Sequence, residues 1–152
     1  MSDTRRRRGF EAERELVRKL WGSGFAVVRA PASGARVRKA VYPDIVAMFK
    51  GKIFALEVKY RSDNSPIYIE KEQIQKLLEF ARRAGATPLI AVKRPHQGWR
   101  LVPLRVAKET SSGRIRIDEE VLKKAMSLEE FVTYATNTSL ESFMKRGQDS
   151  AG

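Results

Sequence analysis

Apolar residues recur at helical spacing in two parts of the chain, and each stripe predicts a helix with one inward face. The first lies between Gly9 and Gly24 and consists of Phe10, Leu16, Val17, Leu20 and Trp21. The second predicts a helix from Glu70 to Gly85 and consists of Ile74, Leu77, Leu78 and Ala81. Glycine follows both stripes, as is common where helices end.

Short runs rich in β-branched and aromatic residues predict strands. Gly51 supplies turn geometry between two of these runs, so that pair is expected to form a hairpin. The five runs are residues 25–29, 44–49, 53–59, 87–93 and 98–103. Their alternation with the two helices predicts an α/β domain with a central mixed five-stranded sheet flanked by helices.

The remainder of the chain predicts smaller elements. Residues 114–117 alternate as a short strand would, Asp118 can cap a helix, and Ser127 with Glu130 fits a capping box. We expect a basic N-terminal arm over residues 1–8, one domain over 9–136, and a polar, flexible tail over 137–152. A long basic loop is predicted over residues 30–42.

Composition narrows the functional classes. Lysine and arginine number 30 against 18 acidic residues, a formal charge of +12, which favours a nucleic-acid partner. The chain has 152 residues without an apolar run long enough to span a bilayer or a typical secretion signal, so we expect a soluble, cytoplasmic protein. Because it has no cysteine and one histidine, any metal must be a hard cation bound by carboxylates.

Candidate chemistry begins with Glu57 and Lys59, which leave the same face of a predicted strand because they are two residues apart. Taken alone, such alternation is more often the solvent-exposed face of an ordinary strand. Asp44 opens the adjacent strand, so two carboxylates can converge there and favour a divalent cation such as magnesium. Taken alone, Asp44 is equally well explained as a turn residue at a strand start.

Glu13 lies in the middle of the first apolar stripe and therefore points inward. An unpaired carboxylate near a core is costly, so Glu13 is expected to meet a metal, a hydrogen-bond donor or a cation. A salt bridge to a buried arginine such as Arg29 is the alternative without a functional role.

The order Glu13, Pro43-Asp44, Glu57-Val58-Lys59 resembles the PD-(D/E)XK motif of restriction-endonuclease-like nucleases. Further segments narrow the resemblance to archaeal Holliday junction resolvases of the Hjc type. They are residues 9–16, 24–29, 56–59, 78–83, 91–93 and 98–100. The loop before Asp44 is longer and more basic than the family pattern.

This resemblance implies a structure-selective DNA endonuclease that resolves four-way junctions. It assigns metal ligation to Asp44, Glu57, Glu13 and the Val58 carbonyl, and contact with the attacking water and scissile phosphate to Lys59. The expected cofactor is Mg²⁺, with Mn²⁺ as a substitute. The residues assigned to substrate contact are Arg14, Arg29, Ser33, Arg36, Arg38 and Lys39.

Other interpretations remain open at this point. Arg14 fits a solvated helix face equally well, and Gln73 fits either a polar helper of the site or an ordinary surface residue. Since a stacked junction is nearly two-fold symmetric, we expect a homodimer. The candidates for its interface, or equally for the core, are the residues Phe80, Trp99 and Leu101 and the predicted C-terminal helices. A different PD-(D/E)XK repair or restriction-type endonuclease, or a non-catalytic basic nucleic-acid-binding protein, are the alternative functions.

Overall fold

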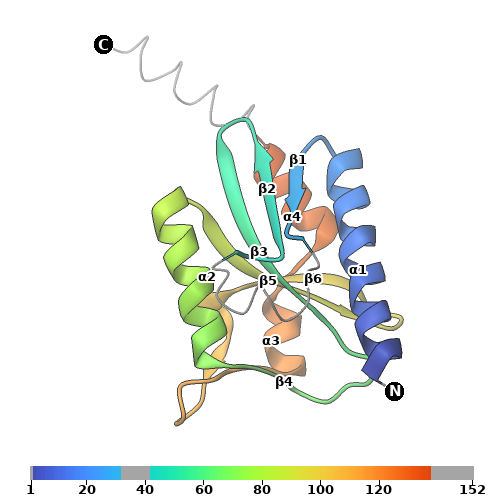
Figure 1. Ribbon diagram of the computed structural model, residues 1–152, viewed down its shortest axis with the longest axis vertical. Coiled ribbons are helices and arrows are strands. Elements are labelled where there is room, and N and C mark those ends of the chain that lie inside the picture. Colours follow the sequence, from blue (N-terminus) through green and yellow to red (C-terminus); the bar gives the residue numbers. More distant parts are fainter. Residues whose placement is uncertain (1, 32–41, 138–152) are drawn as a thin grey trace.

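The computed structural model describes residues 2–31 and 42–137. Its main feature is a six-stranded mixed sheet (Figure 1). The strands, in spatial order, are β1 (Ala26–Arg29), β2 (Ile45–Phe49), β3 (Lys52–Tyr60), β5 (Thr87–Arg94), β6 (Gly98–Pro103) and β9 (Met126–Ser127). Only β3 and β5 run parallel; all other neighbours are antiparallel.

Helices cover both faces of this sheet and bury a core on each. On one face, α1 (Ser2–Gly22) and α4 (Leu128–Thr136) pack with Leu16, Leu20 and Phe131 fully buried. On the other face, α2 (Lys71–Ala84) and α3 (Glu119–Lys124) enclose a second core. Figure 1 shows α1 and α2 on opposite sides of the sheet. The confirmed α/β architecture therefore leaves neither face of the main sheet fully open to solvent.

A small antiparallel sheet adjoins the second core. It contains β4 (Ile67–Ile69), β8 (Ile115–Ile117) and β7 (Lys108–Glu109), and the 3₁₀ turn η2 (Leu104–Val106) follows β6. The predicted Asp118 cap is present, since its carboxylate accepts a bond from the Val121 amide. The predicted capping box of Ser127 and Glu130 is also present. Local side-chain chemistry was therefore a good guide to where these short helices start.

The hairpin joining β2 to β3 turns through Lys50 and Gly51, which both have positive φ (45° and 86°). Such a two-residue turn matches the right-handed twist of the flanking strands. Helix α2 ends as predicted at Gly85, which is its C-cap and has the left-handed conformation that commonly terminates helices.

Three details differ from the sequence-based predictions. Helix α1 begins at Ser2, so residues 2–8 of the predicted N-terminal arm (residues 1–8) belong to the helix. The main sheet has a sixth strand, β9, whose two residues pair with Arg100 and Leu101. The sequence did not indicate it, because two residues are too few to show a strand period. Trp21 and Leu78, each expected in an inward stripe, are 66% and 45% exposed.

Other predictions concern surfaces and the chain ends. Trp99 and Leu101 lie in the core, which removes them as interface candidates. Most of the predicted loop, residues 32–41, and the tail beyond Asn137 lie outside the described residues. In the described ranges, no helix combines the length and apolar character required to cross a membrane.

Candidate active site

The β2–β3 hairpin brings Asp44 beside the catalytic candidates on β3. The register pairs Ile45 with Leu56, so Asp44, one residue before β2, lies at the level of Glu57 on the neighbouring strand. The Val58 amide donates a 2.8 Å hydrogen bond to Oδ2 of Asp44. On the other side, the Asp44 carbonyl accepts a 2.9 Å bond from the Ala30 amide. Asp44 is therefore held by backbone contacts to both flanking strands.

Glu57 and Lys59 project from one face of β3, as predicted, but that face is not an open solvent surface. Their side chains are only 17% and 18% exposed, and Lys59 Nζ lies 3.9 Å from Oε1 of Glu57. Ala55, which precedes them on the same face, is fully buried in the second core. A charged pair at the edge of a core has a higher desolvation cost than a solvated one, which favours the functional interpretation.

The three carboxylates influence one another electrostatically. Burial, followed by the negative charge of Asp44, raises the pKa of Glu57 to about 8, although the charge of Lys59 opposes that shift. Burial also raises the pKa of Glu13, with a further contribution from the charge of Asp44. Burial, together with repulsion between the carboxylates, therefore disfavours the charged forms of Glu57 and Glu13. A cation placed near them would favour those charged forms.

Glu13 does point inward, and its direct partner is Arg29. The Nε of Arg29 donates a 3.0 Å bond to Oε2 of Glu13, and the two side chains are 24% and 17% exposed. The Arg29 guanidinium also lies over the ring of Phe10, 5.8 Å from its centroid. Of the two interpretations of Glu13, the structure therefore shows the salt bridge, within an acidic cluster that still extends to Asp44 and Glu57.

The remaining predicted site residues divide into three groups. Arg14 is exposed on α1, consistent with either interpretation of that residue. Gln73 is exposed at the start of α2, yet its Oε1 lies 3.5 Å from Lys59 Nζ, a contact that helical periodicity alone could not indicate. The substrate candidates that lie outside the described residues are Ser33, Arg36, Arg38 and Lys39.

The donor set suits a hard cation better than zinc. Asp44 and Glu57 supply carboxylate oxygens, and β3 carries the neighbouring Val58 carbonyl. Within the described ranges, no three acidic or histidine side chains are already arranged as a complete metal-binding group. Magnesium commonly uses one or two carboxylates and takes its other ligands from water and substrate phosphates, so two converging carboxylates fit its chemistry.

Comparisons with known proteins place this geometry in a family. The family described as archaeal Holliday junction resolvase (Hjc) matches residues 4–140. The chain is 41% identical over 140 residues to the crossover junction endodeoxyribonuclease Hjc of Sulfurisphaera tokodaii, covering 90% of this chain and 96% of the relative. It is 35% identical over 123 residues to the enzyme of the same name from Archaeoglobus fulgidus, covering 81% and 88%.

A solved structure agrees with these sequence matches. The chain resembles the structure of Archaeoglobus fulgidus Hjc, described as a Holliday junction resolvase, with a TM-score of 0.72 and 34% identity over 81% of this chain and 96% of the other. The fold, the order of the acidic residues and the sequence similarity all agree. This chain belongs to the archaeal Holliday junction resolvase (Hjc) family.

Proposed function

We propose that this chain is a homodimeric, magnesium-dependent DNA endonuclease that resolves four-way junctions in the cytoplasm by paired phosphodiester hydrolysis. The observation that carries the proposal is the convergence of Asp44, Glu57 and Lys59 on the β2–β3 hairpin of a chain in this family. The named relatives are crossover junction endodeoxyribonucleases. Their activity and the site geometry together support junction cleavage.

Asp44, Glu57 and the Val58 carbonyl would hold the cation, and Mn²⁺ is expected to substitute for Mg²⁺. The Val58 amide donates a hydrogen bond to Oδ2 of Asp44, which holds the carboxylate at the level of Glu57. Because Glu57 has a raised pKa, it would lose its proton when the cation binds. When bound, a divalent cation supplies positive charge against the oxygens of the scissile phosphate.

The chain's own groups account for the rest of the chemistry. Hydrolysis forms a bond from a water oxygen to phosphorus and breaks one phosphorus–oxygen ester bond, whose leaving oxygen gains a proton. The Lys59 ammonium, positioned by Glu57 and Gln73, is suited to orient that water and to donate hydrogen bonds to the phosphate. Glu13, bound to Arg29, would complete the acidic side of the site and hold that guanidinium toward the substrate.

A second copy of the chain is expected because a junction presents two strands for cleavage. An apolar hollow beside the active site offers a surface on which the second copy can pack. Its lining includes Val28, which is 58% exposed, Tyr42, which is 62% exposed, and Val46 with Phe80. Large exposed apolar side chains in one hollow are typical of protein interfaces. Phe80 is thus the one predicted interface candidate of the three that still fits.

The dimer is tested by sedimentation of the wild type, Val28→Glu and a control, Tyr134→Glu. Tyr134 is 66% exposed on α4, away from this hollow, so the control adds the same charge elsewhere. We expect a dimer for wild type and control and a monomer for Val28→Glu, which then nicks one strand instead of two. A dimeric Val28→Glu would exclude this surface.

The cleavage activity is tested with a four-way junction and a linear duplex of matching arms, with Mg²⁺, Mn²⁺ or a chelator. Asp44→Asn is compared with Asp118→Asn, the same change at a helix cap that asparagine also supports. We expect symmetric nicks in the junction from wild type and Asp118→Asn with metal, and none from Asp44→Asn. Equal cutting of duplex would favour a repair or restriction-type endonuclease. DNA binding without cutting by any variant would favour a non-catalytic protein.

A further inference from the structure

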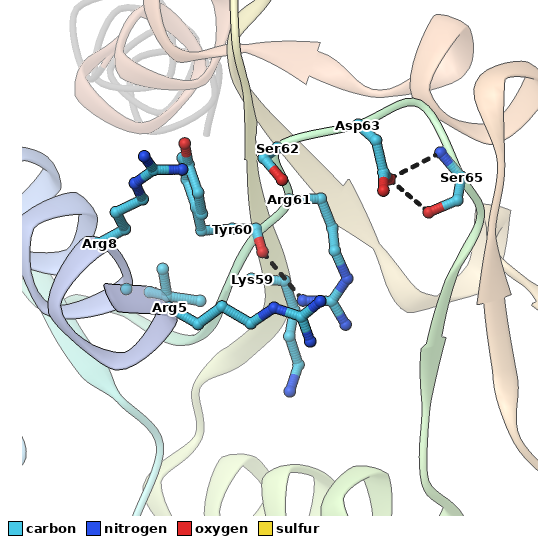
Figure 2. A pocket seen from close by; sticks show the side chains of 10 residues that line it. Arg5, Arg8, Lys59, Tyr60, Arg61, Ser62, Asp63 and Ser65 are labelled. Atoms are coloured by element: carbon cyan, nitrogen blue, oxygen red, sulfur yellow. Dashed lines mark hydrogen bonds between the residues drawn. The ribbon is translucent and has the colours of Figure 1, made fainter. Parts of the chain in front are cut away.

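A hollow of about 450 Å³ opens beside Lys59, between the start of α1 and the loop that follows β3 (Figure 2). Arg5, Arg8 and Gly9 line it from the helix, and the stretch from Val58 to Asp63 lines it from the opposite side, together with Ser65. Because Val58 and Lys59 belong both to the lining of this hollow and to the candidate active site, the hollow lies next to that site.

Cations dominate the lining. Arg5 and Arg8 are three residues apart on α1 and so lie on the same side of the helix. The Nη1 of Arg61 donates a 2.9 Å bond to the Tyr60 carbonyl, which holds that guanidinium near the strand end. Figure 2 shows the Arg5 and Arg61 guanidinium groups directed toward one another, with the Lys59 side chain beside them. Like charges gathered in this way repel unless an anion lies between them.

The acidic residue in the lining is hydrogen-bonded to a neighbouring serine and, within the part of the chain that the structure describes, forms no ion pair with these cations. The Asp63 carboxylate accepts hydrogen bonds from the amide and the hydroxyl of Ser65, which lower its pKa. Within residues 4–31 and 42–137, no ion pair joins Arg5, Arg8 or Arg61 to a carboxylate. Arg7 on the same helix differs, because its Nε lies 3.6 Å from Oε1 of Glu11 and it does not line the hollow.

We propose that this hollow binds the phosphodiester backbone of the cleaved strand next to the scissile bond, through Arg5, Arg8 and Arg61. The guanidinium fork matches phosphate oxygens, and the hollow is large enough for more than a single phosphate group. The strand would leave the catalytic residues past the first turns of α1. This inference rests on the proposed nuclease function and adds the path of the substrate.

The first experiment measures junction binding in chelator for Arg5→Ala/Arg8→Ala, Arg61→Ala and the control Arg7→Ala. Loss of a phosphate contact is expected to weaken binding by about tenfold and to make the slope of log K against log salt less steep by about 0.9 per contact. Arg7→Ala removes one charge from the same helix and is expected to change Kd by less than about threefold. Equal melting temperatures would show that the variants are folded.

The second experiment places one uncharged methylphosphonate linkage at successive positions along the cleaved strand. At the linkage that Arg61 contacts, the uncharged substitution is expected to lower the affinity of the wild type. It should not lower the affinity of Arg61→Ala further, because that variant already lacks the contact. We expect this coupling at linkages next to the scissile bond and additive effects at remote ones. Coupling only at remote linkages would overturn the proposal.

These outcomes are distinct from a failure of the proposed function. If the wild type neither binds nor cuts junctions, the nuclease function itself is wrong. If the wild type cuts junctions but the Arg5/Arg8 and Arg61 variants behave like Arg7→Ala, only the assignment of the hollow is overturned. If both variants lose affinity and couple to linkages beside the scissile bond, the substrate path is established.

Discussion

Glu57 and Glu13 in the candidate active site have pKa values displaced in the opposite direction from those of Asp118 and Glu120 at the start of α3. Burial raises the pKa of Glu57 and of Glu13. Near α3, hydrogen bonds from the Lys108 ammonium lower the pKa of Asp118 and of Glu120. Both regions are rich in charge, but hydrogen bonds from Lys108 outweigh burial near α3, whereas burial outweighs the cationic partners of Glu57 and Glu13. The difference separates carboxylates that the fold stabilises in their charged form from carboxylates that it stabilises in their protonated form.

The largest expected effect comes from removing the Lys59 ammonium group from the acidic site. Lys59→Met is expected to lower the rate of junction cleavage by about 10³-fold, because the ammonium is suited to act on charge that develops in the transition state. Junction binding should change little, since the variant keeps the surrounding arginines. Single-turnover cleavage and binding assays measure the two quantities. A parallel loss of affinity and rate would make Lys59 a simple binding residue.

Glu57→Gln is expected to stabilise the metal-free protein while abolishing cleavage. The folded-state pKa of about 8 exceeds the ordinary value of 4.5, so the folded protein holds this proton more tightly than the unfolded chain. The contribution of Glu57 to stability is therefore complete below pH 4.5 and is lost as the pH rises through 8. A glutamine side chain does not ionise, so Glu57→Gln does not lose this contribution to stability as the pH rises.

The free energy of unfolding should accordingly exceed that of the wild type by a margin that grows across this window to a few kcal/mol, at about 1.4 kcal/mol per pKa unit. Urea unfolding in chelator at several pH values measures it. Added Mg²⁺ should narrow the margin by stabilising the wild type. A margin independent of pH would contradict the raised pKa of Glu57.

Arg29→Gln tests whether the Glu13–Arg29 pair belongs to the acidic site or only to the fold. Loss of the partner leaves a largely buried carboxylate, at a cost of about 1–3 kcal/mol in stability. Addition of Glu13→Gln should recover part of that stability, which a double-mutant cycle measures. If the pair also supports catalysis, the double variant stays impaired in cleavage. Full recovery of cleavage would make the pair purely structural.

Ser127→Ala has the smallest expected effect and is the reference for a change outside the candidate active site. Loss of the cap hydrogen bond to the Glu130 amide is expected to cost about 1 kcal/mol of stability. Cleavage well below the melting temperature should be unchanged, because β5 and β6 separate β9, which contains Ser127, from β3 in the sheet. Thermal unfolding and a cleavage assay check both statements. A clear loss of cleavage would show that this cap influences the candidate active site across the sheet.

Predictions from the sequence succeeded where a local pattern determined the structure and failed where it did not. The stripe containing Leu16 and Leu20 correctly predicted a helix, but it could not show that α1 starts at Ser2, because no apolar period extends through the arginines. Arginine favours helices, so the helix continues into that stretch. The exposed Trp21 shows the opposite error, since periodicity cannot tell where neighbouring elements stop covering a stripe.

The sequence by itself determined the hairpin that carries Asp44, Glu57 and Lys59, and it indicated that Glu13 points inward and needs a partner. These features follow from strand and helix periods, which are local properties of the backbone. Only the tertiary structure decided that Arg29 is that partner, that α2 brings Gln73 to Lys59, and that Arg5 and Arg61 line one hollow. Each of these contacts joins different elements, so it depends on how the helices pack against the sheet.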